Sequence, residues 1–203
     1  MGIVERKERE REEMRKLILE AAQKLFLANG FEKVSIRNIA DEIEYSPATI
    51  YLYYKDKNEL LFALHQLGFA KMIDAFQPLL TLTDPFKKVV AMGRSYIQFA
   101  VQNPELFDLM FIMNAPMDKL DKEDWVEGDR AFGLLTQVVQ ECMDAGIFQQ
   151  RDVRVVAMMI WSGIHGYTAL YLRKRLGMFA ECDRQPIMDD AFALFCDMLK
   201  RGL

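Results

Sequence analysis

Side chains able to bond to nucleic acid are concentrated around residues 46–49. Ser46 is a good helix N-cap, and Pro47 follows it at the first helical position, where a missing N–H costs nothing. Ala48 and Thr49 then place one small and one polar side chain at the start of the same short helix. Such a helix suits the DNA major groove, where the edges of the bases can be told apart. The pattern therefore predicts base recognition by this helix.

The residues that follow suit phosphate contacts and anchoring. Tyr51 and Tyr53 fall on the outward side of the helix, where phenol groups can reach phosphates. Ile50 and Tyr54 fall on the opposite side and are expected to anchor the helix to a core. Lys57 begins the next helix and adds a positive charge beside that helix's N-terminal N–H groups.

Other reactive side chains give no catalytic or metal pattern. Ser162 and His165 lie three residues apart, but no acidic residue is placed to orient the histidine for nucleophilic catalysis. The second histidine, His65, is distant in sequence. We expect no catalytic residues, no metal site and no cofactor, and a structural or interface hydrogen bond for His165.

Charge alone does not point to DNA. The 203-residue chain is 51% hydrophobic and 28% charged, as in ordinary soluble globular proteins, with a net charge of −4. Residues 1–58 hold 11 basic and 11 acidic residues, and residues 59–203 hold 15 and 19. The front of the chain is neutral, whereas phosphate binding needs lysine and arginine.

The chain is expected to be cytoplasmic. Three irregularly spaced cysteines suit a reducing compartment, and the charged stretch from Glu5 to Arg15 is not a secretory signal. Val155 to Leu172 contains no charged residue and just reaches the length of a membrane span, but basic residues flank both of its ends. We interpret it as a buried or dimer-interface helix and expect no membrane partner. The cysteines are Cys142, Cys182 and Cys196.

Helical periodicity runs through the whole chain and predicts an all-α fold of about nine helices. The first helix ends at Asn29-Gly30, the second begins after Ser35, and the third runs from Ser46 to about Tyr53. The apolar face of the first helix is expected to comprise Met14, Leu17, Ile18, Ala21, Leu25 and Phe26, and that of the second Ile36, Ile39, Ala40 and Ile43. A capping box of Asp56 and Glu59 starts a fourth helix that ends near Pro78. Further helices are expected over 85–103, 104–113, 125–145, 152–175 and 187–201, with a polar loop at 118–124.

The segment from Leu25 to Leu61 resembles the DNA-binding domain of the tetracycline-repressor (TetR/AcrR) family. The resemblance rests on the order and spacing of Gly30-Phe31, Val34-Ser35-Ile36, Ile39-Ala40 and the run from Tyr45 to Leu61. It implies a three-helix helix-turn-helix domain over residues 1–56 and a larger helical ligand-binding and dimerisation bundle over residues 57–203. The segments 103–111 and 161–166 resemble the Trp-His-Gly subgroup of C-terminal domains in this family.

By position, the resemblance also implies which residues touch DNA: Arg37, Ser46, Pro47, Ala48, Thr49, Tyr51, Tyr53 and Lys57. Thr49 and Arg37 are the expected base contacts, and Tyr51, Tyr53 and Lys57 the expected phosphate contacts. One position departs from the family pattern, because Glu44 stands where a glycine is usual between the second and third helices. If that turn requires a left-handed residue, Glu44 costs about 1–2 kcal/mol.

An adaptable apolar interior is expected in the C-terminal part, because the chain holds 13 methionines and 14 phenylalanines. Such an interior suits an apolar or aromatic small-molecule effector. The expected lining is Phe76, Met92, Tyr96, Phe99, Phe107, Met110, Met113, Phe132, Trp161, His165 and Tyr167. Gly163 and Gly166 permit close helix approach, and copies of the last two helices are expected to form a homodimer.

The favoured function is therefore a ligand-responsive transcriptional regulator, a repressor that binds a palindromic operator as a dimer and is released by its effector. Two alternatives remain at this point. One is a helical protein-interaction module without DNA binding, for which Glu44 and the neutral front are the hints. The other is a small helical enzyme, which would need convergent titratable groups.

Overall fold

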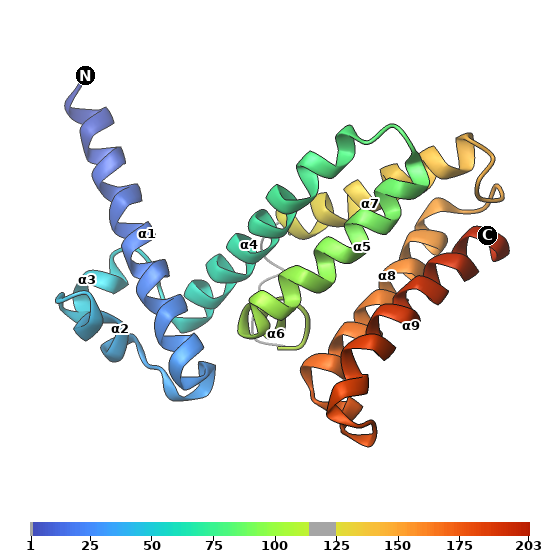
Figure 1. Cartoon of the computed structure of the whole chain (residues 1–203). Helices are drawn as coiled ribbons and strands as arrows, with labels where there is room; N and C mark the ends of the chain where they lie inside the picture. Colours follow the sequence, from blue (N-terminus) through green and yellow to red (C-terminus); the bar gives the residue numbers. More distant parts are fainter. Residues whose placement is uncertain (1, 114–124) are drawn as a thin grey trace. The chain divides into compact units, whose positions relative to one another are not determined.

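The computed structural model describes residues 2–113 and 125–203, and these residues form α-helices, short 3₁₀ helices and no strand (Figure 1). The described part contains nine α-helices, so the predicted all-α class and helix number are confirmed. The polar loop expected at 118–124 lies outside the described residues. The chain divides into two compact units, residues 1–68 with 105–125 and residues 69–104 with 126–203.

The first unit contains the N-terminal helices and one later helix. Its elements are α1 (Ile3–Asn29), η1 (Phe31–Lys33), α2 (Ile36–Glu42), α3 (Pro47–Tyr51), the first part of α4 (Lys57–Phe76) and nearly all of α6 (Pro104–Phe111). The chain passes into the second unit within α4, after Gly68. The boundary expected after residue 56 stays a prediction.

Capping residues set the helix ends in this unit. Gly30 follows α1 with a φ of 81°, a backbone conformation that glycine adopts at little cost. Ser35 caps α2, since its Oγ accepts from Asn38 N, and Asn38 Oδ1 accepts in return from Ser35 N. Neighbouring helices are also joined by an ion pair, in which Lys24 Nζ of α1 lies 2.5 Å from Glu42 Oε1 of α2.

Apolar side chains from all these helices form the core of the first unit. Its fully buried members include Ile18, Ala22, Ile39, Ile50, Leu60 and Leu64. The inward face predicted for α1 was wrong at Leu17, which is 39% exposed, and Leu25 is half-buried. The buried stripe is centred on Ile18 and Ala22, so both leucines lie at its edges. Ile43, also expected to face inward, is half-buried at the end of α2.

His65 is completely buried in this unit. Its ring stacks on Phe62 at 6.1 Å and on Trp125 at 5.9 Å between ring centroids. Burial lowers the pKa of His65 to about 4, although a hydrogen bond with the backbone of Met110 acts in the opposite direction. The imidazole is therefore neutral at pH 7 in the folded chain.

Gly68 brings α4 and α6 unusually close together. A Cβ at this position would lie 2.6 Å from Met110 Sδ and 3.1 Å from Leu106 Cδ1. Real Cβ atoms do not approach sulfur so closely, so a larger residue at this position would force the Met110 side chain or the helix to shift.

The second unit is a helical bundle. Its elements are the end of α4, η2 (Gln77–Thr81), α5 (Pro85–Gln102), α7 (Val126–Asp144), α8 (Val153–Leu172), η4 (Arg175–Met178) and α9 (Glu181–Gly202). Asp84 caps α5 by accepting from Phe86 N and Lys87 N. A Cβ at Gly163 of α8 would lie 2.6 Å from the Phe195 ring of α9, so the predicted close helix approach is confirmed at Gly163. Gly166 faces open space within the chain.

Several predicted boundaries were wrong. The last helix begins at Glu181, six residues before the predicted residue 187, and contains Pro186. Glu181 and Asp183 stabilise that beginning, because acidic side chains interact favourably with a helix N-terminus. The third helix ends at Tyr51 instead of Tyr53, and the 3₁₀ helices η1, η2 and η4 were not predicted.

Helix α8 is apolar but incompletely covered. It is the one helix among the described residues that is long and apolar enough to cross a membrane, with a mean hydropathy of 1.3. Within the single chain, 28% of its apolar window is buried. Val155, Met159 and Leu170 remain exposed on its surface.

His65 makes the stability of the chain depend on pH. Its pKa is lower in the folded than in the unfolded chain, so unfolding takes up a proton below pH 6.5. We expect the free energy of unfolding to fall by up to about 3 kcal/mol between pH 7 and pH 4 because of this group. Denaturant titrations of wild type and His65→Phe at both pH values measure the effect. An equal loss in the two proteins would contradict it.

Candidate nucleic-acid interface

Helices α2 and α3 are joined by a tight turn that requires a left-handed residue. Glu44 has a φ of 59°. Its N–H donates to Asp41 O at 3.3 Å, and Tyr45 N–H donates to Ala40 O at 2.9 Å. This bond pattern is the Schellman motif, in which glycine is the usual residue at the position of Glu44. The chain thus keeps the turn geometry and tolerates a strained glutamate.

The start of α3 is held by a side-chain cap. Ser46 Oγ accepts from Thr49 N at 3.2 Å and lies 3.0 Å from Thr49 Oγ1. Ser46 and Ala48 are exposed, whereas Pro47 and Thr49 are half-buried. The cap therefore fixes the Thr49 hydroxyl, the expected base contact, on the outer side of the helix.

The opposite side of α3 is anchored in the core, as predicted. Ile50 is completely buried and Tyr54 is 1% exposed. The Tyr54 hydroxyl donates to Arg15 O at 3.5 Å, and the Arg15 guanidinium lies 4.9 Å from the Tyr54 ring centroid. Burial raises the pKa of Tyr54, so its phenol remains a hydrogen-bond donor.

The remaining predicted contacts lie on the outside of the same unit. Tyr51 is 54% exposed, Arg37 of α2 is exposed, and Tyr53 is half-buried. Leu52, which sequence reasoning missed, is 77% exposed beside them. Its exposure could have been predicted, because Leu52 lies between Tyr51 and Tyr53, which were both expected to face outward.

Lys57 has a more internal position than the sequence implied. Its Nζ donates to Phe31 O at 2.6 Å and lies 5.8 Å from the Phe26 ring centroid. The ammonium carries three N–H donors, so this contact orients the side chain and joins α4 to η1. Nearby, Asp56 Oδ1 accepts from Glu59 N, but Glu59 Oε2 accepts from Lys55 N and not from Asp56 N. The predicted capping box is thus formed with its second bond shifted by one residue.

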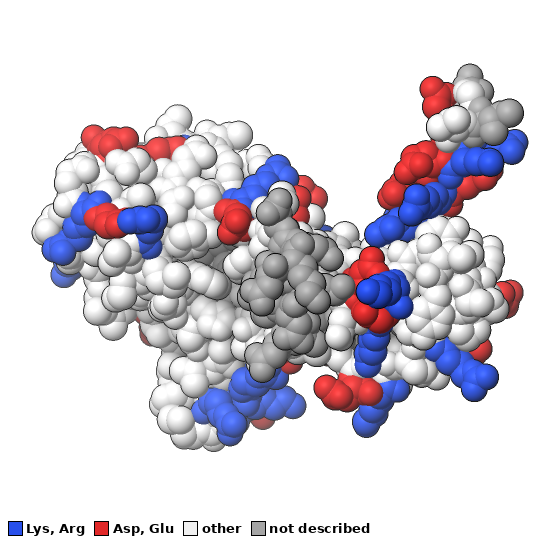
Figure 2. Space-filling view, turned by 180° about the vertical axis from the view of Figure 1, so that it is seen from behind, with Lys and Arg blue, Asp and Glu red and all other residues white. Residues whose placement is uncertain are grey.

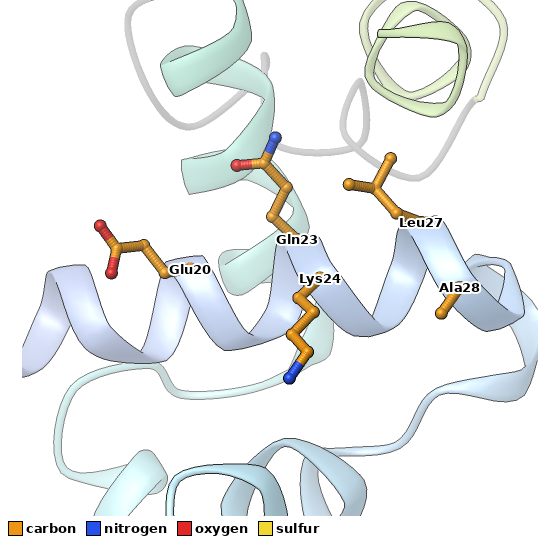
Figure 3. A pocket seen from close by; sticks show the side chains of 5 residues that line it. All are labelled: Glu20, Gln23, Lys24, Leu27 and Ala28. Atoms are coloured by element: carbon orange, nitrogen blue, oxygen red, sulfur yellow. The ribbon is translucent and has the colours of Figure 1, made fainter.

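The expected effector-contacting residues are divided between the units. Phe107, Met110 and Met113 belong to the first unit, and the other eight belong to the second. In the first unit, two hollows lie beside α1. One is an open hollow lined by Glu20, Gln23, Lys24, Leu27 and Ala28 (Figure 3), and the other is a crevice lined by Gln23, Phe26, Leu27, Phe31, Leu64, Glu105, Leu106 and Leu109. Neither hollow contains any of the eleven predicted residues.

A hydrogen-bonded aromatic cluster joins four of the predicted residues in the second unit. Tyr96 Oη lies 2.8 Å from His165 Nδ1, and Trp161 Nε1 donates to Tyr96 Oη at 3.5 Å. Phe132 packs on Trp161 with 6.1 Å between ring centroids. Burial raises the pKa of Tyr96 and lowers that of His165, so both are neutral at pH 7. An indole can only donate, so Tyr96 Oη accepts from Trp161, and the direction of the Tyr96–His165 hydrogen bond depends on the tautomer of the histidine.

Two family models match the chain. The model described as "Bacterial regulatory proteins, tetR family" matches residues 18–64. The model described as "Tetracyclin repressor-like, C-terminal domain" matches residues 89–195. The second description covers such domains in general, so the Trp-His-Gly subgroup stays a prediction.

Individual proteins give consistent results. An HTH-type transcriptional regulator from Staphylococcus aureus (strain bovine RF122 / ET3-1) is 32% identical over 95 residues, which are 46% of this chain and 51% of that relative. The match thus spans about half of that relative's length. A protein of unknown function from Rhodococcus sp. RHA1 has the same fold, with a TM-score of 0.75, 22% identity and coverage of 93% and 94% of the two chains. The regulator FadR from Bacillus subtilis in complex with stearoyl-CoA also has this fold, with a TM-score of 0.71 and 16% identity. The match covers 93% of this chain and 98% of that chain.

Replacing Glu44 tests the strained turn. Glu44→Gly removes the left-handed penalty of about 1–2 kcal/mol but makes the unfolded chain more flexible. We expect a net gain of up to about 1 kcal/mol in the free energy of unfolding, measured by denaturant titration. Glu44→Ala is the control, because it removes the carboxylate and keeps the strain. An equal gain in both variants would assign the effect to charge.

Proposed function

Because the chain belongs to the TetR family of bacterial regulatory proteins, we propose that it is a ligand-responsive transcriptional repressor that binds a palindromic operator as a homodimer. The observation that carries this proposal is the anchoring of α3. Its inner side is buried through Ile50 and Tyr54, while Ser46, Ala48 and Thr49 stand at its outer N-terminal end. The N-terminal end of a recognition helix is the part that contacts base edges.

The DNA-binding domain comprises residues 1–56 in this proposal, and residues 57–203 bind the effector and form the dimer. Thr49 and Arg37 contact bases, and Tyr51, Tyr53 and Lys57 contact phosphates. Ser46, Pro47 and Ala48 complete the surface at the groove. The internal contact of the Lys57 ammonium with Phe31 O supports a fixed orientation, because two of its N–H donors remain for a phosphate oxygen.

Dimerisation is assigned to α8 and α9. Val155, Met159, Ser162, Gly166 and Leu170 follow one another at steps of three or four residues, so they share one face of α8, and all are exposed. On α9, Leu194 and Met198 are 61% and 62% exposed. Exposed apolar side chains that gather on neighbouring helix faces mark interaction sites. A two-fold contact between copies of both helices covers them without involving a membrane, in keeping with a cytoplasmic protein.

The effector is a small, largely apolar molecule. The aromatic cluster of Tyr96, Phe132, Trp161 and His165 supports this class, because a few polar atoms stand within an apolar surrounding. FadR from Bacillus subtilis was solved with stearoyl-CoA, which makes acyl thioesters reasonable first probes for this chain. The effector acts by preferring a dimer whose two α3 helices no longer match successive major grooves, about 34–36 Å apart.

Two other functions are less well supported. Family membership favours a regulator over an enzyme. A protein-interaction module without DNA binding would use Ser46 and Thr49 only for the cap of α3.

Selection of duplexes from a random pool by the purified protein tests the proposal. We expect a palindromic consensus with half-sites about one helical turn apart. Adding stearoyl-CoA or apolar small molecules to the complex of the protein with the recovered operator is expected to release the DNA. Recovery of no preferred sequence, with or without the probes, would contradict the proposal.

Two substitutions separate the expected contacts. Thr49→Ala is expected to reduce discrimination between operator and random DNA, because it removes a base contact. Lys57→Ala is expected to weaken binding to both DNAs, because it removes a phosphate contact. The slope of log affinity against log salt concentration is expected to fall by about one per protomer. Competition binding at several salt concentrations measures both effects. Wild-type behaviour of both variants would show that these residues do not contact DNA.

A further inference from the structure

The first turns of α1 are helical but unpacked. Every residue from Val4 to Glu13 is exposed. An isolated helix as short as residues 4–13 is marginal in water, so this segment needs support from its own side chains. Arg6 pairs with Glu10 at 3.4 Å and Arg9 with Glu13 at 3.7 Å. These pairs favour a straight helix that extends beyond the core of the first unit.

The remaining cations of this segment lie in a single row. Lys7, Arg11 and Arg15 are spaced four residues apart and therefore share one side of the helix, which we name the basic row. Among the described residues, neither Lys7 nor Arg11 has an ion-pair partner. Figure 2 shows lysine and arginine side chains in a line along the protruding part of α1, with acidic side chains beside them.

The basic row lies on the side of α1 that packs against the rest of the first unit. Farther along the helix the same side continues into Ile18 and Ala22, which are completely buried. At the C-terminal end of the row, Arg15 Nη1 donates to Tyr53 O at 3.4 Å. Tyr53 follows α3 directly, so the row begins at the proposed DNA surface and extends away from it.

We propose that Lys7 and Arg11 bind phosphates of the duplex that flanks the half-site read by α3. This inference rests on the proposed DNA binding and adds a second contact region to it. The positive charges of the basic row lie in a line along α1, so they fit a rod-like polyanion such as a DNA duplex. Glu8 and Glu12 form the neighbouring row, so a partner is attracted only when it approaches along the basic side. A broad anionic surface such as a membrane would meet both rows.

The experiment compares two double variants of the full-length protein that remove the same charge from the same exposed segment. Lys7→Gln with Arg11→Gln neutralises the exposed part of the basic row. Arg6→Gln with Arg9→Gln is the matched control on other faces of the helix, in which glutamine keeps a high helix propensity and its amide can still donate to Glu10 and Glu13 in place of the ion pairs. Each is titrated with the selected operator in two forms, one ending at the half-sites and one extended by about one helical turn on each side.

We expect wild type and the control to bind the extended duplex with the same salt dependence. In the Lys7/Arg11 variant, the slope of log affinity against log salt falls by about 0.9 for each lost phosphate contact, and thus by up to about 3.6 for a dimer. On the short duplex, all three proteins have the same slope. Hydrogen exchange gives a second readout, since amides 4–13 are expected to become protected by the extended duplex in wild type and not in the Lys7/Arg11 variant.

The outcomes separate the two proposals. Equal slopes for both variants on the extended duplex overturn the assignment of the basic row, and binding of the short operator by wild type still supports the proposed function. Absence of sequence-specific binding by wild type overturns both. Protection of amides 4–13 by an acidic protein, and not by DNA, would also overturn the proposed occupant.

Discussion

Burial of Ile50 and Tyr54 determines where the outer face of α3 points. A helix of five residues cannot form stably by itself, because its nucleation is unfavourable. Its position therefore depends on these two side chains and on the cap from Ser46. Arg15 adds to the anchoring by stacking on Tyr54, which ties the helix-turn-helix to α1. Without these contacts, Thr49 would have no defined orientation.

In the turn before α3, the hydrogen bonds that position the helix are kept although they place a residue in an unfavourable backbone conformation. Glu44 occupies a left-handed conformation that glycine would adopt more easily, yet the Schellman hydrogen bonds are formed. Its carboxylate also reduces the positive potential near the proposed DNA surface. The neutral charge of residues 1–58 has the same consequence, so specific contacts matter more here than in a strongly basic domain.

Local signals predicted much of this fold. Ser35 and Ser46 each accept the N–H bond expected of a cap, and the helix-turn-helix follows from their spacing. Features that depend on distant residues could not be predicted. The contact of Lys57 with Phe31 joins residues 26 positions apart, and the early start of α9 conflicts with the tendency of Pro186 to open a helix. The expected effector residues are distributed over two units, which periodicity cannot reveal, because it describes one helix at a time.

The glycine at position 68 affects how α6 can move. Between most packed helices, side chains interlock, and a shift of one helix requires several of them to repack. At Gly68 the partner is the thioether of Met110, an unbranched and flexible side chain that adapts by rotation about its own bonds. A small sliding of α6 along α4 at this point therefore requires only the side chains of Met110 and Leu106 to rearrange.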